Sequence, residues 1–323
     1  MLAELGKKIA ERWLSLLALP GALWLATLTT AHVLGQRHAL DVSRLVRRID
    51  GWASSATGRS PSGLAVVLLA VLLGSAGVGL AAQAVGVAAE RLSLAAEWAR
   101  WPPPLRQFAR WRVTRRRERW DELVQARDAQ TELRRRARAR SRITGLPDPD
   151  PTADPGRSPR DPTLISPERP ARPTWSGDRL HAVELRLNRD CRVDLPTVWP
   201  ALWLALPDSV RGEITATREA LARAMVLGGW GILYVLPAFL WWPSALIACA
   251  VVATAWPRAR AMTDAYAMLL EGAVRLHALD LARSVGVPHV ERLDKTTGWQ
   301  LTCILQGRGD LIELTSPEPP TAA

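Results

Sequence analysis

Three long stretches without a charged side chain constrain this chain most strongly. They cover residues 13–34, 64–89 and 224–257 and are 22, 26 and 34 residues long. A helix of roughly 20 apolar residues crosses the hydrocarbon core of a bilayer, which is about 30 Å thick. Most apolar residues are concentrated in these stretches, and the charged residues are concentrated between them. We therefore predict an all-α, multi-pass membrane protein with about four transmembrane helices in two hairpins.

The first two stretches predict a transmembrane hairpin over residues 13–89, preceded by a cytoplasmic N-terminus over residues 1–12. Basic residues (Lys7, Lys8 and Arg12) come before the first apolar run, which also fits a cleaved signal peptide. The length of that run and the lack of a clear small-x-small cleavage site favour a membrane span.

Small residues in the second stretch indicate where another helix can approach. Gly74, Ser75 and Gly79 are the candidates, and Ser75 and Gly79 have small-xxx-small spacing. The alternative is that glycine and alanine are simply common in membrane helices.

The loop between these two stretches predicts a short amphipathic helix on the membrane surface. It carries five arginines, and its apolar residues recur at helical spacing. These apolar residues are Val42, Leu45, Val46, Ile49 and Trp52.

A strongly basic juxtamembrane segment follows over residues 90–145. Residues 91–143 hold 16 arginines and six acids, which accounts for +10 of the formal net charge of +11. Three consecutive prolines at 102–104 end any helix that continues from the second stretch, and a charged helix is predicted over residues 105–142. The lipid- or partner-binding candidates are Trp98, Trp101, Arg106, Arg110, Trp111, Arg112, Arg115, Arg116, Arg117 and Arg119.

This basic segment admits three interpretations. It can be a stem whose arginines fix the topology, a site for anionic lipid headgroups, or a nucleic-acid site. The interspersed acids disfavour nucleic acid and fit a solvated helix. Membrane lipids and either a protein partner or self-association are therefore the predicted partners.

The second half of the chain begins with a proline-rich linker. Residues 146–174 contain nine prolines and few apolar residues, so we expect them to be extended or disordered. Residues 175–222 predict a cytoplasmic helical segment. Asp208 is a plausible N-cap within it.

The third uncharged stretch predicts a second transmembrane hairpin over residues 223–257. Its length exceeds one comfortable span, and a turn is expected around Trp241, Trp242 and Pro243. One kinked helix and a re-entrant hairpin are the alternatives. Residues 258–323 then predict an amphipathic helix, ended by Gly286, and a small tail with weak β-type alternation.

The arginine distribution predicts the orientation. The basic segment after the second stretch is the strongest Lys/Arg signal, so that side is assigned to the cytoplasm by the positive-inside rule. Both termini of a plasma-membrane protein with two hairpins then lie in the cytoplasm. The arginines of the first loop oppose this assignment but are fewer.

No motif for catalysis or cofactor binding is found in the sequence. It lacks a P-loop, a G-x-S-x-G, a kinase set and metal-type His or Cys spacing, and its three cysteines lie far apart. The uncharged stretches contain no Asp or Glu of the kind that forms a proton relay. We predict no enzyme activity, no cofactor and no metal.

Two blocks in the second half carry a family resemblance. They read SGDRLHAVE at residues 176–184 and DLPTVWPALW at residues 194–203. The chain resembles uncharacterised actinobacterial multi-pass membrane proteins, in which a similar pattern precedes a closing helical hairpin. The Ala- and Arg-rich composition fits a high-GC bacterial genome. Residues 185–192 depart from that pattern, and the resemblance implies no catalytic residue.

The function that these features favour is a non-enzymatic membrane anchor or scaffold that presents basic cytoplasmic segments to partners or anionic lipids. The alternative is an oligomeric pore or transporter-like membrane effector of a stress or defence system, although the apolar stretches argue against a monomeric channel.

Overall fold

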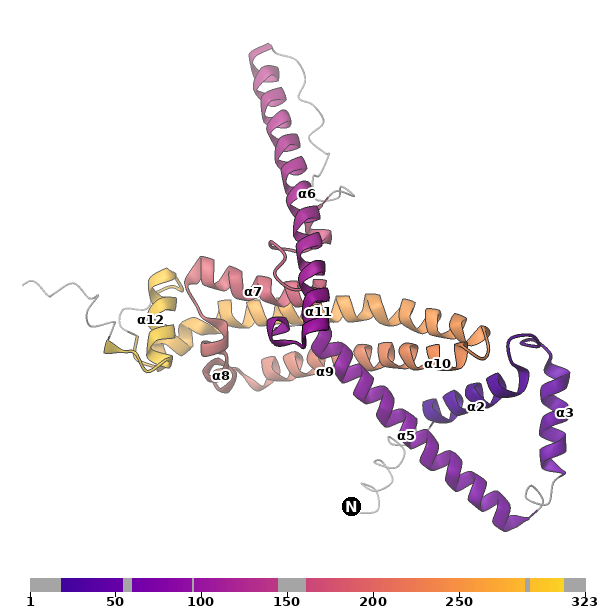
Figure 1. Ribbon diagram of the computed structural model, residues 1–323. Helices are drawn as coiled ribbons and strands as arrows, with labels where there is room; N and C mark the ends of the chain where they lie inside the picture. The colour runs from indigo at the N-terminus through magenta and orange to yellow at the C-terminus, as the bar shows by residue number, and fades with distance from the viewer. Residues whose placement is uncertain (1–18, 55–59, 95, 145–160, 288–290, 311–323) are drawn as a thin grey trace, which may run out of the picture. The chain divides into compact units, whose positions relative to one another are not determined.

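The computed structural model describes residues 19–54, 60–94, 96–144, 161–287 and 291–310 (Figure 1). Within these ranges the ordered elements are helices, and no strand occurs, so the predicted all-α class is confirmed. The chain divides into two compact units. Unit 1 comprises Met1–Arg91 and Glu219–Ala261, and unit 2 comprises Leu92–Arg218 and Met262–Ala323.

Some predictions concern residues outside the described ranges. They are the cytoplasmic N-terminus and the beginning of the first apolar stretch (1–18), most of the proline-rich linker (145–160) and the end of the tail (311–323).

Unit 1 is built from two groups of helices that lie far apart in the sequence. The first group is α2 (Leu19–Leu34), α3 (Val42–Ala53) and most of α5 (Pro61–Leu94). The second is the later part of α9 (Asp208–Leu233), α10 (Val235–Ala238) and the first part of α11 (Pro243–Ser284). A small cluster that includes Trp24, Trp230 and Tyr234 joins the two groups.

Helix α5 buries small residues and exposes large apolar ones. Its buried residues are Ser75, Gly79, Ala82 and Gly86. In contrast, many of its leucines and valines are exposed, and Leu73 is 67% exposed. A helix in water shows the opposite pattern, because burial of a leucine side chain is worth about 2 kcal/mol. The surface of α5 is therefore suited to an apolar solvent.

Two helical stretches are long and apolar enough to cross a membrane, namely Pro61–Leu94 and Asp208–Ala238. They support the predicted membrane location. Among the described residues, α2 is a shorter apolar helix, and α11 does not meet the same criterion, so four spans are not established.

Glycine permits the close crossing of α5 and α9. A Cβ atom placed on Gly229 would lie 2.6 Å from the carbonyl oxygen of Ala82 and 2.9 Å from the nitrogen of Gly86. A Cβ on Gly86 would lie 2.7 Å from the Cα of Val226. Such distances are shorter than real Cβ contacts, so only glycine fits. Small residues of this kind let membrane helices approach backbone to backbone.

The second hairpin has the turn that the sequence predicts. Helix α9 ends at Leu233 and α10 at Ala238, and α11 begins at Pro243, where the missing N–H of proline leaves no helical hydrogen bond unmade. Side chains of the first loop fix this turn. Gln36 Nε2 donates to the carbonyls of Ala238 and Phe239 (3.0 and 2.9 Å), and Trp241 Nε1 donates to the carbonyl of Ala39 (2.8 Å).

The structure differs from the prediction after this hairpin. The sequence suggested a boundary at Pro257 between a span and a separate amphipathic helix, but α11 continues through Pro257 to Ser284. An internal proline removes one helical hydrogen bond and does not end a helix whose neighbours, such as Ala255 and Ala259, strongly favour helix. Gly286, with a φ of 84°, follows the end of α11 as predicted.

Unit 2 has a larger core of aliphatic side chains. It contains α6 (Pro103–Thr144), the short turns η2 (Trp98–Arg100) and η4 (Pro162–Leu164), α7 (Trp175–Cys191), α8 (Leu195–Ala205), α12 (Lys295–Leu305), the start of α9 and the end of α11. Leu187, Val198, Leu202, Val274 and Leu301 are fully buried in this core. They come from α7, α8, α11 and α12.

The predicted β-type tail is wrong for residues 291–310. Lys295–Leu305 is the helix α12, and Asp294 caps it by accepting a hydrogen bond from the Thr297 nitrogen at 2.8 Å. Gly298, Leu301 and Thr302 are buried on one face of this helix. Gly298 permits close approach to the carbonyl of Cys191. Burial of a helical face therefore overrides the weak alternation.

The N-terminal end of α9 also differs in detail. Asp208 lies within the first turn and forms an ion pair with Arg211, whereas the Pro207 carbonyl accepts the first backbone hydrogen bonds. Asp208 is therefore not the N-cap.

Candidate functional site

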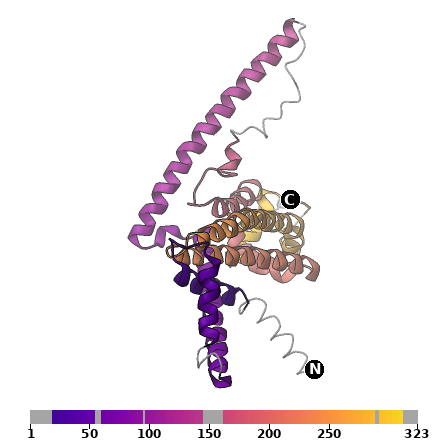
Figure 2. The same ribbon diagram turned by 90° about the vertical axis from the view of Figure 1, so that its right-hand side faces the viewer.

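The predicted basic helix forms as α6, which starts within the proline triplet and runs without interruption for 42 residues (Figure 2). The rigid φ of proline suits the first turn of this helix, where a backbone donor is not needed. The candidate residues on this segment do not form a single surface. They separate onto two sides of α6.

One side of α6 is an exposed aromatic and arginine face. Phe108 and Trp111 are each 54% exposed, and their rings lie 5.8 Å apart. Arg112 lies 6.0 Å from the Phe108 ring centroid, and Arg115 lies 5.6 Å from that of Trp111. Residues at this spacing share a helix face. We call Phe108, Trp111, Arg112 and Arg115 the aromatic–arginine face.

The other side of α6 binds the end of the predicted linker. Arg116 Nη2 donates to the Ile165 carbonyl at 2.7 Å, and Arg117 Nε donates to the Pro170 carbonyl at 2.6 Å. Trp120 Nε1 donates to the Ser166 carbonyl at 3.0 Å. We call Arg116, Arg117 and Trp120 the α6 clamp. Arg116 and Arg117 therefore bind backbone carbonyls of the same chain.

The clamp corrects the prediction for residues 161–174. These residues were expected to be extended or disordered, but they are ordered against α6 and include η4. The carbonyls of Ile165, Ser166 and Pro170 accept the hydrogen bonds of the clamp, which matches the donor-only side chains of arginine and tryptophan. Trp98 contributes in the same way by donating to the Ala171 carbonyl at 3.1 Å. Composition alone did not show that these acceptors would find partners.

Asp178 lies at the centre of this contact. Its side chain is 2% exposed and accepts from Arg116 Nη2 at 2.7 Å and from the backbone nitrogens of Ala171 and Arg172 at 2.9 and 2.7 Å. Burial raises the pKa of the Asp178 carboxyl, and its three donors oppose that rise. Because three donors already occupy its acceptor positions, the Asp178 carboxylate has a structural role.

The remaining candidates on this segment make fewer contacts. Arg106 and Trp101 are half-buried, and Arg110 and Arg119 are exposed. Arg106 carries a buried Nε for which no hydrogen-bond partner is found.

The helix-packing candidates lie on α5. Ser75 and Gly79 are buried, and Gly21 of α2 lies against the carbonyl of Ser75. Gly74 is half-buried, and its nearest neighbour is the side chain of Leu25. Gly86 was not among the candidates, although its spacing from Gly79 and Ala82 continues the same face.

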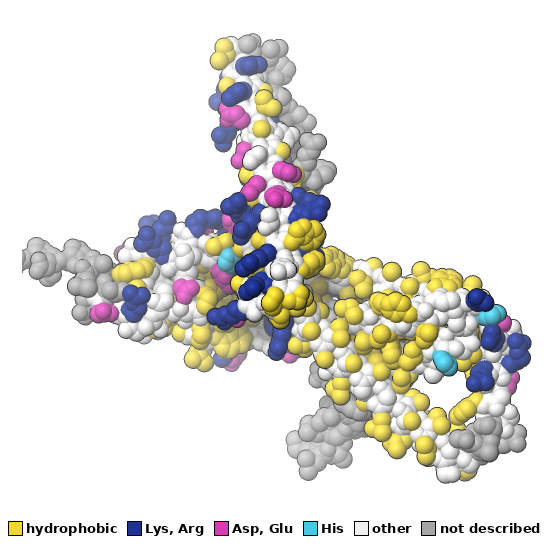
Figure 3. Space-filling view, viewed as in Figure 1, with side chains coloured by type: hydrophobic (Ala, Val, Ile, Leu, Met, Phe, Trp, Pro, Cys, Tyr) yellow, Lys and Arg dark blue, Asp and Glu magenta, His cyan; other side chains and the backbone are white. Residues whose placement is uncertain are grey.

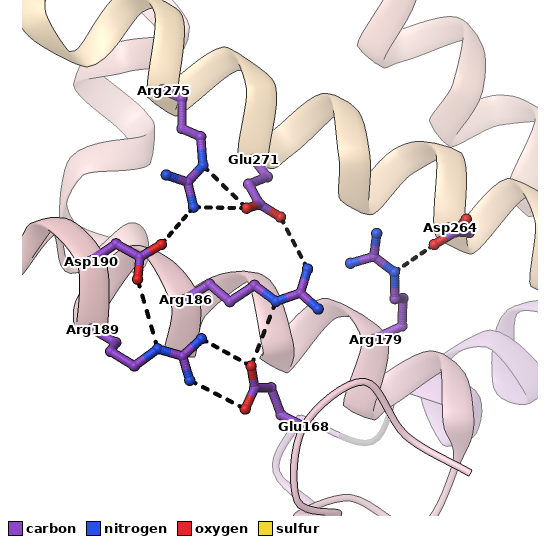
Figure 4. A network of polar contacts seen from close by, with 8 residues as sticks. All are labelled: Glu168, Arg179, Arg186, Arg189, Asp190, Asp264, Glu271 and Arg275. Atoms are coloured by element: carbon purple, nitrogen blue, oxygen red, sulfur yellow. Dashed lines mark hydrogen bonds and ion pairs between the residues drawn. The ribbon is translucent and has the colours of Figure 1, made fainter. Parts of the chain in front are cut away.

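A closed ring of six charges joins residues 161–174, α7 and α11 (Figure 4). Acids and arginines alternate around it, with N···O distances from 2.8 to 3.7 Å. In order, the members are Glu168, Arg186, Glu271, Arg275, Asp190 and Arg189.

The ring is electrically balanced, since it holds three acids and three arginines. The hydrogen bond from Arg275 lowers the pKa of the Asp190 carboxyl. No carboxyl of the ring therefore lacks a cation that stabilises its charge. Such a network positions helices, whereas a general acid or base needs a carboxyl with a proton to exchange near neutral pH. Only the Glu271–Arg275 pair has the i, i+4 spacing of a helical ion pair, and most of the other pairs join residues far apart in the chain.

Neither a cluster of potential metal ligands nor a disulfide is found among the described residues. No group of three or more His, Cys, Asp or Glu side chains converges among them. Cys191 and Cys303 are buried, Cys249 is exposed, and the three are unpaired as thiols. Burial raises the pKa of the Cys191 thiol, which favours its unreactive protonated form.

Comparisons with known protein families, with curated proteins and with solved structures find no match to this chain. The resemblance to actinobacterial membrane proteins therefore stays a prediction.

Proposed function

We propose that this protein is a non-enzymatic integral membrane anchor whose folded extramembrane part, unit 2, is presented at a surface of anionic lipid. The observation that carries the proposal is α5, which exposes leucine and valine and buries glycine, serine and alanine. A surface of that kind is stable when the solvent is hydrocarbon. In this proposal four helices span the plasma membrane, and both termini and unit 2 are cytoplasmic.

The aromatic–arginine face is the proposed lipid contact. Only eight residues separate the end of α5 at Leu94 from the start of α6 at Pro103, so chain connectivity makes α6 a juxtamembrane helix. Exposed Phe and Trp rings suit the bilayer interface, and each nearby arginine contributes about 1 kcal/mol of attraction to an anionic surface. The α6 clamp contributes little to this contact, since its arginines hold residues 161–174.

Two measurements test the anchor and its lipid contact separately. Full-length protein in native membranes should resist extraction by alkaline carbonate, and reporters fused after Arg142 and Ala323 should be cytoplasmic. Release by carbonate would refute the anchor, and outside reporters would refute the orientation.

For the lipid contact, hydrogen exchange of the full chain is compared in nanodiscs of phosphatidylcholine with and without phosphatidylglycerol. We expect residues 105–115 to exchange up to about thirtyfold more slowly in the anionic discs, since two arginines contribute about 2 kcal/mol and about 1.4 kcal/mol corresponds to a factor of ten. The variant Arg112→Gln/Arg115→Gln should lose most of this protection. The matched control Arg135→Gln/Arg138→Gln removes the same charge from an exposed part of α6 and should keep it. Equal exchange in both discs would disprove the lipid contact but not the anchor.

A further inference from the structure

A basic hollow in unit 1 lies between α2 and α3. It is an open cleft of about 730 Å³, within the range of roughly 300–1,000 Å³ that is usual for small-molecule sites. Its lining is His32, Val33, His38, Asp41, Arg44, Arg47 and Arg48. We call it the α2–α3 cleft. Basic and histidine side chains gather over α3 in the space-filling view (Figure 3).

The three arginines of the cleft share one face of α3. Arg44, Arg47 and Arg48 have i, i+3 and i+4 spacing, which brings their side chains together. Asp41 is the single acid in the lining. Its carboxylate accepts from Ser43 Oγ at 2.7 Å and from the Arg44 nitrogen at 3.0 Å, so it caps α3. These two hydrogen bonds lower the pKa of the Asp41 carboxyl, which stays charged. Three cations against one anion leave the cleft with a net charge of +2.

The histidine of the adjoining turn adds a neutral donor. Arg44 Nη1 lies 3.0 Å from His38 Nδ1. A guanidinium only donates, so Nδ1 is the acceptor, and this hydrogen-bond network assigns the imidazole proton to Nε2. His38 therefore has one N–H left for a ligand. Arginine forks together with such a donor match the oxygens of a phosphate group.

The apolar face of α3 indicates that the cleft lies at the level of the lipid headgroups. Val42, Val46, Ile49 and Trp52 are between 46% and 66% exposed and face away from the arginines. A helix with this division lies in the bilayer interface, with its apolar face among the acyl chains and its basic face at headgroup level. Trp242, whose backbone nitrogen donates to Gln36 Oε1 at 3.1 Å, lines a smaller hollow beside the cleft. An aromatic residue at that position also suits the interface.

We propose that the α2–α3 cleft binds the phosphate of an anionic phospholipid headgroup, held by Arg44, Arg47 and Arg48 with His38 as an additional donor. The proposal rests on the membrane location of unit 1, because α3 must lie in the interface for a headgroup to reach the cleft. It concerns a loop that the proposed orientation places on the other side of the membrane from α6. This protein would then hold anionic lipid in both leaflets.

The test uses the full chain in nanodiscs of phosphatidylcholine with phosphatidylglycerol, followed by release into mild detergent and native mass spectrometry. We expect wild-type protein to retain phosphatidylglycerol. The variant Arg44→Gln/Arg47→Gln/Arg48→Gln should retain at least about tenfold less, as the loss of three surface cations predicts. The matched control Arg135→Gln/Arg138→Gln/Arg142→Gln removes three exposed arginines of α6 and should behave as wild type.

A milder variant and a second ligand complete the test. If the triple variant does not fold, Arg47→Gln/Arg48→Gln leaves the Arg44–His38 contact intact and should still lower retention. A thermal shift of the detergent-solubilised protein by inorganic phosphate, without any by phosphatidylglycerol, would assign the cleft to free phosphate and overturn the headgroup proposal. Retention that is equal in wild type and both cleft variants also overturns it. These results are independent of carbonate extraction, which alone tests the anchor.

Discussion

Buried glycine, alanine and serine hold the described helices of unit 1 together, whereas buried leucine and valine fill the core of unit 2. In unit 1 the closest crossings are at Gly21, Gly86 and Gly229, and tryptophan and glutamine side chains donate to backbone carbonyls at the turns. In unit 2 the ion pairs are concentrated, and arginines hold both acids and backbone carbonyls.

The contrast is the one expected between helices packed in hydrocarbon and a core packed in water. In hydrocarbon a leucine gains nothing by leaving lipid for a helix interface, so close backbone approach provides the attraction. In water the same leucine is driven into a core, and charged networks can lie at its edge. A single chain of one secondary-structure class thus follows two packing rules, which makes equivalent substitutions in the two units behave differently.

The largest expected effect comes from truncating one leucine in each unit. Leu187→Ala removes a fully buried side chain from the core of unit 2 and should destabilise the protein by about 2–5 kcal/mol. Leu69→Ala on α5 changes a side chain that is 57% exposed and should cost less than about 0.5 kcal/mol. Thermal unfolding of the full chain in detergent measures both. Similar losses for both variants would mean that α5 does not face lipid.

A smaller effect on stability is expected from replacing glycine by alanine. Its sign should differ between two sites in unit 1. Gly229→Ala would place Cβ against backbone atoms of α5 and should cost about 1–3 kcal/mol. Gly77→Ala meets nothing within 4 Å and should be neutral or stabilise α5 by up to about 1 kcal/mol. The measurement is the midpoint of thermal unfolding of each variant, compared with wild type. A harmless Gly229→Ala would contradict the close α5–α9 crossing.

The smallest effect concerns acid stability. Because the pKa of Asp190 is lower in the folded protein, the unfolded chain binds more protons between that value and about 3.9. The stabilisation is therefore complete above pH of about 4 and is lost as the pH falls through the folded-state pKa. Asp190→Asn should make the unfolding midpoint fall less steeply on acidification, whereas Asp310→Asn, an exposed control, should leave the slope unchanged. Identical slopes for wild type and Asp190→Asn would show that the ring does not couple to pH.

The sequence predicts features that depend on local chemistry. The proline triplet and the charge pattern predict α6, the apolar spacing predicts α3, and Pro243 marks the start of α11. Each of these follows from residues within a few turns of one another. The membrane location follows in the same way from the uncharged stretches, in its coarser form.

The sequence does not predict features that depend on partners far along the chain. Residues 161–174 have few apolar side chains, and arginine and tryptophan donors about 50 residues earlier hold them by hydrogen bonds. Lys295–Leu305 is a helix because it is buried against α7 and α8, which its own weak alternation does not show. The α2–α3 cleft combines His32 of one helix with Arg44, Arg47 and Arg48 of another, so its charge density appears only after folding.

The clamp fixes α6 near Trp120, and the helix continues from there to Thr144. These 24 residues (144 − 120) amount to about 36 Å at 1.5 Å per residue. A continuous helix is stiff over that length, so the number of residues sets the distance between Trp120 and Thr144. Deleting whole turns would shorten that distance by about 5 Å each.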